Sequence, residues 1–366
     1  MKFIINREQL LKPLQSVSSV VERRQTLPIL SNVLLSVTDN QLFMTGTDLE
    51  VELQTQIPLE NCEMGEVTIP ARKFLDICRA LPDHANIELV LQENRVVIRS
   101  GKSRFVLSTL PANDFPKIEA IKETVELAIA QNVLKHAIDK TQFAMAQQDV
   151  RYYLNGMLLE VNEGNLMLVA TDGHRLALCD TAQDLDCSEQ VQVIIPRKGI
   201  IELSRLLEGE EETVTFQLGG NFVRISTSNM SFTSKLIDGR FPNYQNVLPS
   251  NTDKEVVCER EPLRQALQRV SILSNEKYRG IRMNFTPGML KIFAHNPEQE
   301  EAEEEVEIDY CGEELEIGFN VNYIMDAVSA GNSDRVQIML SDANSCCLIH
   351  GVDESDCKYV VMPMRL

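Results

Sequence analysis

The sequence predicts an α+β protein made of three similar domains, each with two helices packed on antiparallel sheet. One observation is a faint internal repeat. Thr47-Asp48 recurs 124 residues later as Thr171-Asp172, and Pro70-Ala71-Arg72-Lys73 has a similar segment at Pro196-Arg197-Lys198. Another is that each third of the 366 residues combines short strand-like segments with two helical patterns. Similar domains in a row favour a curved or closed assembly over a single catalytic pocket.

The domains are predicted at residues 1–122, 123–250 and 251–366, because one third of the chain is 122 residues. The first helix of each domain follows from apolar residues at helical spacing. Asn6 is the expected N-cap of the first one, with Gln9 at the capping-box position, and Pro262 suits the first turn of the third. The stripes are Leu10, Leu11, Leu14, Val17 and Val21; Val133, Leu134, Ala137, Ile138 and Met145; and Leu263, Ala266, Leu267 and Val270.

A second helix is expected after an apolar strand in each domain. Segments 33–37, 166–170 and 335–340 are typical of strands because they are short and rich in Val, Leu and Ile. The second helices carry the stripes Phe74, Leu75, Cys78 and Leu81; Ile200, Ile201 and Leu207; and Ile324 and Val328. Runs of strands with two helices on one side indicate the α+β class.

Composition is that of a soluble globular protein, with 43% hydrophobic and 24% charged residues. No apolar run approaches the roughly 18 residues that span a bilayer, and the N-terminus lacks a signal-peptide pattern, so we expect no membrane association. Nine scattered cysteines fit reduced thiols and a cytoplasmic location better than a disulfide framework. The net charge of −19 alone argues against a nucleic-acid binder, but the excess negative charge is concentrated toward the C-terminus: residues 1–122 hold 14 basic and 15 acidic residues, and residues 251–366 hold 11 and 22.

Two charged edges of opposite sign are predicted at the ends of the chain. Residues 298–305 hold six glutamates, which by themselves are typical of a solvated acidic loop. Their counterpart is a basic cluster around a Ser100-Gly101 turn between apolar strands, formed by Arg95, Arg99, Lys102 and Arg104. Open strand edges invite pairing, and charges select the partner. We therefore expect these edges to meet head to tail between two chains, which gives a homodimeric ring of six domains.

The predicted helices also carry basic residues largely off their apolar stripes. Ordinary solvated helix surface explains any single case, but recurrence across the repeat favours a shared positive surface. Contacts between such a positive surface and nucleic-acid phosphates are independent of the base sequence and sensitive to salt. These residues are Arg7 and Lys12; Arg72, Lys73 and Arg79; Lys135 and Lys140; Arg197, Lys198 and Arg205; and Arg264 and Arg269.

Common catalytic and nucleotide-binding motifs are absent from the sequence, so we expect no enzyme activity, no catalytic residues and no cofactor. Residues 171–175 place a hydroxyl, a carboxylate and an imidazole close together, but Asp-Gly is also a hairpin turn, and the echo at Thr47-Asp48 favours turn architecture. Cys347, His350 and Cys357 form an incomplete zinc pattern, so no metal is expected.

Long strings along the whole chain resemble the bacterial β sliding clamps, the processivity subunits of DNA polymerase III. Such clamps are head-to-tail homodimers whose twelve helices line a hole around duplex DNA, and a loader opens them with ATP. The strings are Leu27-Pro28-Ile29-Leu30, Asp149-Val150-Arg151-Tyr152-Tyr153-Leu154-Asn155-Gly156, Ala170-Thr171-Asp172-Gly173-His174-Arg175-Leu176, Ser274-Asn275-Glu276-Lys277, Asn296-Pro297-Glu298-Gln299-Glu300 and Tyr359-Val360-Val361-Met362-Pro363-Met364-Arg365-Leu366.

The resemblance implies three sets of site residues. The DNA contacts are Arg24, Arg72, Lys73, Gln148, Tyr153, Arg197, Lys198 and Arg205. The dimer interface comprises Lys73, Arg95, Lys102, Arg104, Phe105 and Leu107 on one side and Ile272, Leu273, Glu298, Glu300, Glu301 and Glu304 on the other. The peptide pocket, between the second and third domains, comprises Leu154, Thr171, Gly173, His174, Arg175, Leu176, Pro242, Val247, Tyr323, Val360, Met362, Pro363, Met364 and Arg365.

The partners implied are a clamp loader, the replicative polymerase, translesion polymerases, mismatch repair proteins, ligase and a replication-initiation regulator. Methionines suit a site that accepts varied apolar anchors. Asn246 and Asn344 stand at the rim, where the family pattern has a basic and an apolar residue. The sequence thus predicts a DNA sliding clamp; the alternatives are an acidic protein-interaction scaffold without topological DNA binding, and a hydrolase or transferase using Asp172 and His174.

Overall fold

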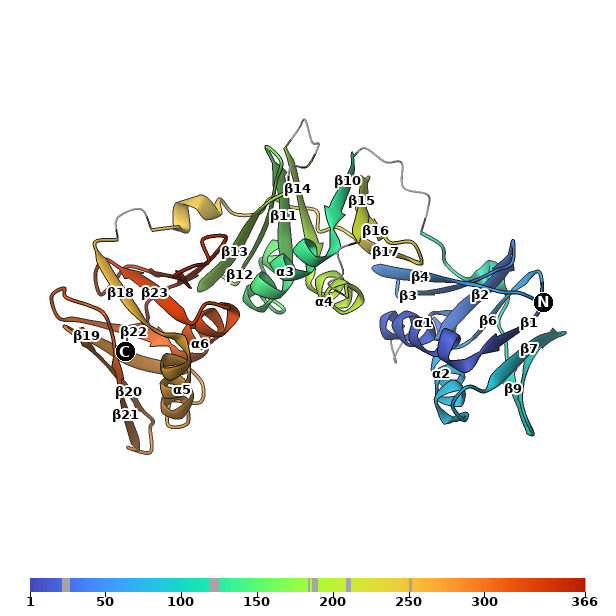
Figure 1. The fold of residues 1–366 in the computed structure, drawn as a ribbon, viewed down its shortest axis with the longest axis horizontal. Coiled ribbons are helices and arrows are strands. Elements are labelled where there is room, and N and C mark those ends of the chain that lie inside the picture. The colour runs from blue at the N-terminus through green and yellow to red at the C-terminus, as the bar shows by residue number, and fades with distance from the viewer. Residues whose placement is uncertain are drawn as a thin grey trace. The chain divides into compact units, whose positions relative to one another are not determined.

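The structure is a computed structural model that describes residues 1–21, 27–118, 125–183, 185, 190–208, 212–249 and 252–365. The chain divides into two compact units, whose helices and strands are labelled in Figure 1. The first unit comprises residues 1–132 and 201–236, and the second comprises residues 133–200 and 237–366. No helix within the described ranges is long and apolar enough to cross a membrane.

One order of elements occurs three times along the chain: a strand, a helix, four strands, a helix and three strands. The first copy adds a two-residue strand, β5. It comprises β1 (Lys2–Asn6), α1 (Arg7–Val20), β2 (Asn32–Thr38), β3 (Gln41–Thr47), β4 (Val51–Pro58), β5 (Cys62–Glu63), β6 (Gly65–Pro70), α2 (Ala71–Ala80), β7 (Asn86–Gln92), β8 (Arg95–Ser100) and β9 (Ser103–Ser108).

The second and third copies follow the same order without the extra strand. The second comprises β10 (Val125–Ala130), α3 (Gln131–Thr141), β11 (Gly156–Asn162), β12 (Asn165–Thr171), β13 (Arg175–Ala182), β14 (Val191–Pro196), α4 (Arg197–Leu206), β15 (Thr213–Gly219), β16 (Phe222–Ser226) and β17 (Met230–Lys235). The third comprises β18 (Lys254–Glu259), α5 (Arg260–Ser271), β19 (Gly280–Thr286), β20 (Met289–His295), β21 (Glu301–Glu307), β22 (Leu315–Asn320), α6 (Val321–Ala330), β23 (Arg335–Leu340), β24 (Cys347–Gly351) and β25 (Cys357–Val361).

Each unit contains one eight-stranded antiparallel sheet that joins strands from neighbouring copies. In the first unit the order is β10-β15-β16-β17-β4-β3-β2-β6, and β17 pairs with β4 from Met230↔Thr55 to Ser234↔Val51. In the second unit the order is β14-β11-β12-β13-β25-β24-β23-β18, and β13 pairs with β25 from Arg175↔Val361 to Cys179↔Cys357. The copies are therefore connected by continuous backbone ladders as well as by the chain.

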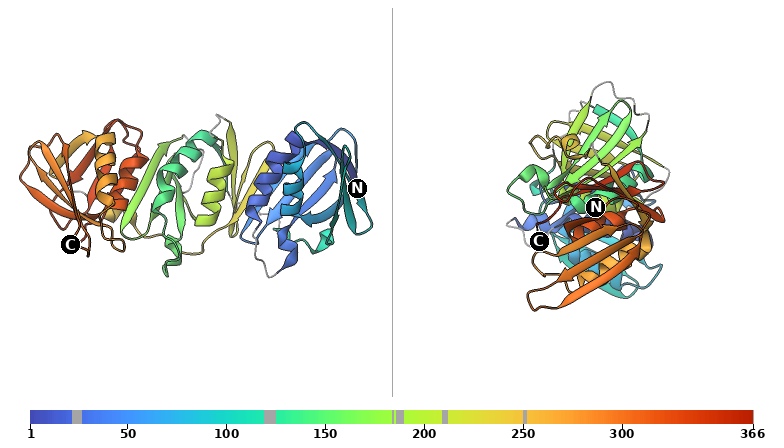
Figure 2. Two further views of the ribbon diagram at one scale, coloured as in Figure 1. Left: turned by 90° about the horizontal axis from the view of Figure 1, so that it is seen from below. Right: turned by 90° about the vertical axis from the view of Figure 1, so that its left-hand side faces the viewer.

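A smaller antiparallel sheet completes each unit. Its strand order is β5-β1-β7-β8-β9 in the first unit and β21-β20-β19-β22 in the second. Figure 2 shows α1 lying beside α2, and α5 beside α6. Leu10, Leu14 and Val17 on α1 are fully buried, as the predicted stripe requires.

Local sequence signals explain how the helices begin and end. Asn6 caps α1 as predicted, because its side chain accepts a hydrogen bond from the Glu8 N–H at 3.0 Å. Helix α3 is shorter than predicted: it ends at Thr141, whose hydroxyl donates to the Ala137 carbonyl at 2.7 Å. A 3₁₀ turn over Gln142–Ala144 follows directly, so Met145 lies beyond α3. Val21 is likewise outside α1, at its C-cap.

Two of the basic residues expected on exposed helix faces are instead held inside the protein. The Arg7 guanidinium donates through Nε to the Cys78 carbonyl at 2.9 Å, and only 13% of its side chain is exposed. The Lys140 ammonium donates to the Ala330 carbonyl at 2.5 Å and is buried. Both cations stabilise packing between elements, so the prediction of a solvent-facing charge is wrong for these two.

We predict that Gly46→Ala destabilises the packing of α1 on β3. A Cβ at Gly46 would lie 2.8 Å from the Val17 carbonyl oxygen and 2.9 Å from Val17 Cγ1, so backbone must move. Overpacking of this kind costs about 1–3 kcal/mol. Urea unfolding and hydrogen exchange of the α1 and β3 amides measure the loss. In the control, Gly331→Ala, the new Cβ would lie 3.3 Å from Glu354 Oε2 and 3.9 Å from the Val328 carbonyl oxygen, so no backbone has to move. Equal stability of wild type and Gly46→Ala contradicts this packing.

Candidate functional site

An apolar cavity of 170 Å³ opens in the second unit where β13 and β25 meet the segments before β11 and β18. Its floor is formed by the ends of neighbouring strands in the eight-stranded sheet. Its walls are short 3₁₀ turns at residues 152–154 and 244–247. The lining residues are Arg151, Tyr153, Leu154, Thr171, Gly173, Arg175, Leu176, Pro242, Tyr244, Val247, Val360 and Met362.

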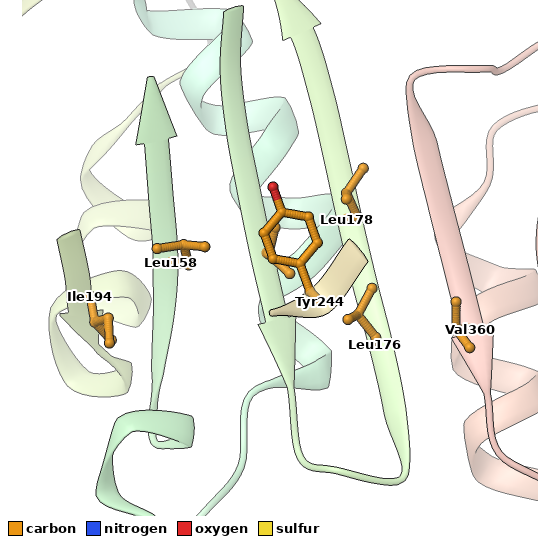
Figure 3. Close-up of a cluster of buried hydrophobic side chains, with 7 residues drawn as sticks. Leu158, Leu176, Leu178, Ile194, Tyr244 and Val360 are labelled. Carbon is orange, nitrogen blue, oxygen red and sulfur yellow. The ribbon is translucent and has the colours of Figure 1, made fainter. Parts of the chain in front are cut away.

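A buried cluster beneath the cavity fixes the shape of its floor (Figure 3). Leu176 and Leu178 project from β13 and Val360 from β25, beside the ring of Tyr244. Because alternate residues of a strand share one face, the strand register places these side chains on the same side of the sheet. Met362 lies just past β25 and is 39% exposed, so the cavity has a flexible apolar side chain at its mouth.

The Tyr244 hydroxyl anchors the 244–247 turn to the sheet. It donates to Glu160 Oε2 at 3.0 Å, and Gln190 Nε2 donates to the other carboxylate oxygen at 2.6 Å. Glu160 is only 4% exposed, so these hydrogen bonds offset the cost of burying its carboxylate. Burial, followed by the contact with Glu160, raises the pKa of the Tyr244 phenol. The phenol therefore stays protonated and remains a donor at neutral pH.

Arg151 forms one rim of the cavity, and Asp149 orients it. The guanidinium bonds both oxygens of Asp149, through Nε at 3.0 Å and Nη2 at 2.8 Å. These hydrogen bonds lower the pKa of the Asp149 carboxyl to about 2. Arg151 also lies across Gly173, where a Cβ would come within 2.8 Å of Nη1. The φ of +88° at Gly173 lies in the left-handed region that favours glycine.

The Thr171-Asp172 segment is a hydrogen-bonded turn, and the corresponding Thr47-Asp48 segment of the repeat forms the equivalent hydrogen bonds. The Thr171 hydroxyl donates to the Arg175 carbonyl at 2.6 Å, as the Thr47 hydroxyl donates to the Val51 carbonyl at 2.9 Å. Each aspartate then accepts from two following backbone N–H groups, at 2.9 and 3.0 Å for Asp172 and 2.9 and 2.8 Å for Asp48. The prediction of turn architecture is confirmed.

Arg175 ties this turn to α6 and to the segment after α3. Its Nε lies 3.1 Å from Asp172 Oδ2, its Nη1 pairs with Asp326, and its Nη2 donates to the Phe143 carbonyl at 2.8 Å. The guanidinium also lies over the Tyr323 ring, 4.6 Å from the centroid. The Asp172 carboxylate is therefore committed to backbone and to Arg175, and no bond from it orients the His174 ring.

Two charged strands lie at open edges of the smaller sheets. Strand β9 is the outer strand of its sheet, with Lys102 in the preceding turn and Arg104 exposed. Strand β21 is the outer strand of the other sheet, so residues 301–307 are a strand rather than a loop. The Glu304 carboxylate already has a partner within the chain, because it forms a bidentate pair with Arg269 at 2.6 and 2.8 Å. Ile272, near the end of α5, is 74% exposed.

Comparison with known proteins identifies the family. Models of the DNA polymerase III beta subunit match residues 1–119 (N-terminal domain), 128–243 (central domain) and 245–365 (C-terminal domain). The chain belongs to the DNA polymerase III beta subunit family. The beta sliding clamps of Pseudomonas aeruginosa and Escherichia coli K12 are 56% and 50% identical to it, over 100% of both chains in each case.

Solved structures of this family agree with the fold. The crystal structure of the DNA polymerase III subunit beta from P. aeruginosa matches with a TM-score of 0.98 at 56% identity, over 100% of both chains. The Caulobacter crescentus pol III beta structure matches with a TM-score of 0.93 at 40% identity, again over 100% of both chains. The predicted α+β class with three similar domains is confirmed.

Nine of the fourteen predicted pocket residues line the cavity. His174 and Tyr323 stack on each other beside it, with ring centroids 6.5 Å apart, and Met364 donates its N–H to the Gly318 carbonyl at 2.7 Å. Pro363 and Arg365 are not in the lining. Arg151, Tyr153 and Tyr244 also line the cavity, although none of them was predicted to do so. The family string that contains Arg151 and Tyr153 was a signal, whereas nothing local marked Tyr244.

The predicted DNA contacts are distributed over several elements. Arg72 and Lys73 are exposed on the first turn of α2, Arg205 is exposed on α4, and Gln148 is exposed in a loop. Arg197 is half-buried and donates to the Met145 carbonyl at 3.1 Å, whereas Lys198 follows it on α4. Tyr153 lines the cavity. Arg24 lies outside the described residues.

We predict that Tyr244→Phe weakens the second unit. The change leaves the buried Glu160 carboxylate with one donor fewer, which costs about 1–3 kcal/mol. The free energy of unfolding, measured in urea, reports the loss. Tyr152→Phe is the matched control because Tyr152 is 57% exposed. An equal effect of the two substitutions contradicts the role given to Tyr244.

Proposed function

We propose that this family member is a DNA sliding clamp: a ring-shaped homodimer that encircles duplex DNA and tethers the replicative polymerase. The observation that carries the proposal is similarity over the full length, at 50–56% identity, to proteins named beta sliding clamps. The domain boundaries we propose are residues 1–122, 123–250 and 251–366. In this proposal the chain has no catalytic residues, needs no cofactor and acts in the cytoplasm.

The two open strand edges support a head-to-tail dimer. An unpaired strand exposes backbone donors and acceptors, and β9 and β21 do so with opposite side-chain charges. Phe105 and Ile272 add apolar area beside those charges. The proposed interface joins Lys73, Arg95, Lys102, Arg104, Phe105 and Leu107 of one protomer to Ile272, Leu273, Glu298, Glu300, Glu301 and Glu304 of its partner. Two identical contacts of this kind close a ring.

The basic residues on helices and loops support sequence-independent contact with DNA. Arg72, Lys73, Arg197, Lys198 and Arg205 reach phosphates in this proposal, joined by Arg24, Gln148 and Tyr153. Such contacts lose strength as salt rises, because each one releases counterions from DNA. The net charge of −19 discourages adhesion elsewhere on the protein, so DNA is retained by topology.

The apolar cavity supports binding of short peptide motifs that contain Gln and Leu or Phe. A volume of 170 Å³ suits one or two apolar side chains, and the P. aeruginosa clamp has a solved structure bound to griselimycin. The peptide donors we propose are the clamp loader, the replicative and translesion polymerases, mismatch repair proteins, ligase and a replication-initiation regulator. Asn246 and Asn344 are the proposed source of any altered peptide preference.

The proposed function is tested by primer extension on a singly primed circle with the cognate polymerase, loader and ATP. We expect product length to rise many-fold when this protein is added at physiological salt. Unchanged product length with a demonstrably active loader and polymerase favours the acidic scaffold instead. A hydrolase or transferase would require turnover that disappears on His174→Ala, and Asp172 is already committed to the turn.

We predict that reversing the charge of the β9 edge separates the dimer. Lys102→Glu/Arg104→Glu places acidic side chains opposite the glutamates of β21, and like charges across an interface are repulsive. Sedimentation at low micromolar concentration should show monomers. Adding Glu300→Lys/Glu301→Lys to the same chain should restore the dimer, whereas the control Lys235→Glu/Arg240→Glu should leave it intact. A dimer that survives the β9 reversal rules out this interface.

We predict that removing residues 362–366 abolishes peptide binding and leaves the dimer. The segment supplies Met362 at the cavity mouth, so its loss opens the site. Because the deletion also removes the Met364 bond to Gly318, Met362→Asp provides a smaller change. Binding of a fluorescent Gln- and Leu-Phe-containing peptide should weaken at least tenfold. Val352→Asp, at the same 39% exposure, is the control. Unchanged binding by Met362→Asp refutes the pocket.

A further inference from the structure

Four side chains of metal-binding type converge in the second unit, on elements far apart in sequence. His136 projects from α3, Cys179 from β13, and Asp356 and Cys357 lie where β25 begins. Their ligand atoms all lie within 4.8 Å of one another. Neither the pocket nor the proposed DNA contacts use any of them. The zinc pattern considered from sequence is a different set: His350 Nδ1 lies 2.9 Å from the Gly351 carbonyl, and of that set only Cys357 joins the cluster.

Strand register explains why the two sulfurs meet. Cys179 and Cys357 are direct partners across the β13–β25 ladder, and the Asp180 N–H donates to the Asp356 carbonyl at 2.8 Å. That bond makes Cys179 and Cys357 a non-hydrogen-bonded pair, the class in which facing side chains come closest. Their Sγ atoms are 2.8 Å apart. Regular strand pairing alone, without a bend or bulge, therefore places the two sulfurs next to each other.

The other two groups close the site from the solvent side. His136 Nε2 lies 4.0 Å from Cys357 Sγ and 3.4 Å from Asp356 Oδ2. Cys179 and Cys357 are 0% and 2% exposed, whereas the side chains of His136 and Asp356 are 37% and 39% exposed. The sulfurs are therefore shielded from water, and an ion can enter between the imidazole and the carboxylate.

We propose that His136, Cys179, Asp356 and Cys357 form a tetrahedral binding site for a thiophilic divalent cation of the Zn²⁺ class. Two sulfurs, one imidazole nitrogen and one carboxylate oxygen are ligands that Zn²⁺ accepts, whereas Mg²⁺ and Ca²⁺ require oxygen. Ligand distances of about 2.0–2.3 Å place tetrahedral ligands roughly 3.3–3.8 Å apart. The observed separations bracket that range, so side-chain rotations alone complete the site: the sulfurs move apart, and His136 moves toward Cys357.

Binding converts both thiols to thiolates and releases their two protons to solvent, with no electron transfer. Two thiolates, one carboxylate and one divalent cation leave a single negative charge. Lys140 lies nearby on α3, held by the Ala330 carbonyl at 2.5 Å and by Glu354 at 3.8 Å. The Lys140 ammonium offsets the single negative charge of the metal-bound site. Because Lys140 is paired with Glu354, it repels the entering cation less strongly than a free ammonium would.

Tyr359 supplies an outer contact. It lies two residues after Cys357, so both side chains project from the same face of β25. Its ring is buried against Phe143, with centroids 5.8 Å apart, and within the described part of the chain its hydroxyl has no hydrogen-bond partner. A phenol in this position can donate to a thiolate sulfur, and such outer-shell bonds orient ligands and tune affinity.

The site lies on the ladder that joins two family domains. Strand β13 belongs to the central domain and β25 to the C-terminal domain, and the opposite end of the same ladder, at Leu176 and Val360, lines the cavity. A bound ion clips these strands together at one end. The proposed consequence is a more rigid ladder, and this inference stands whether or not the cavity binds peptides.

The test is metal binding by the full-length protein, stripped with a chelator and kept reduced. Zn²⁺ titration by calorimetry should give one site, and Co²⁺ should give thiolate-to-metal absorption with tetrahedral d–d bands. Cys179→Ser and Cys357→Ser should each weaken binding by more than about 100-fold, beyond the 10–100-fold typical of outer-shell changes, which is the range expected for Tyr359→Phe. Cys258→Ser, another buried cysteine of the second unit, should bind as wild type.

Three results would overturn the proposal. The first is absence of Zn²⁺ and Co²⁺ binding by reduced wild-type protein whose circular dichroism spectrum matches that of the purified protein. The second is binding that Cys179→Ser, Cys357→Ser and His136→Gln leave unchanged, which would indicate adventitious surface sites. The third is a Cys179–Cys357 disulfide, detected by loss of two alkylatable thiols and a mass lower by two hydrogen atoms, that persists in a thiol buffer with excess Zn²⁺. That result would make the pair a redox bridge.

Discussion

The structure depends above all on antiparallel strand pairing between neighbouring copies of the repeat. Strands β4 and β17 form one such ladder and β13 and β25 the other, so each eight-stranded sheet belongs to two family domains at once. A backbone ladder fixes register residue by residue, and a one-residue slip would turn every buried side chain to the wrong face. Both the apolar cavity and the cysteine pair lie on the β13–β25 ladder, so both inherit their geometry from this register.

Strand pairing also bears on the strands that lie at the edges of the sheets. Several edges are partly covered, by the bridges Thr68↔Leu110 at β6, Val257↔Asp309 at β18 and Gly318↔Met364 at β22. Strands β9 and β21 instead carry opposite charge at open edges. Charged edge strands resist unselective pairing while remaining open to a complementary partner. A chain that joins its own domains edge to edge can use the same contact to join a second copy.

Local signals in the sequence predicted a large part of this structure. The Asn6 cap, the apolar stripes and the Thr-Asp turn each depend on residues only a few positions apart, so their physical effect is visible in the sequence. The end of α3 at Thr141 was missed because no Gly or Pro near it marks a helix end in the sequence. Tyr244 and the His136–Cys357 pair were missed because long-range packing creates them: 84 and 221 residues separate the partners. The family resemblance supplied most of the pocket, whereas alternation alone would have assigned Val360, Met362 and Met364 to the core face of the last strand.

The central claim is that this protein holds DNA by topology, and retention on a nicked circle tests it most directly. The protein is loaded with the cognate clamp loader and ATP, the DNA–protein complex is isolated by gel filtration, and the circle is then cut once. We predict that the protein stays with the circle through filtration and leaves after linearisation. Retention that survives the cut would mean direct binding to DNA, and no retention with an active loader would mean that no ring forms around it. Either result would contradict retention by a closed ring around the DNA.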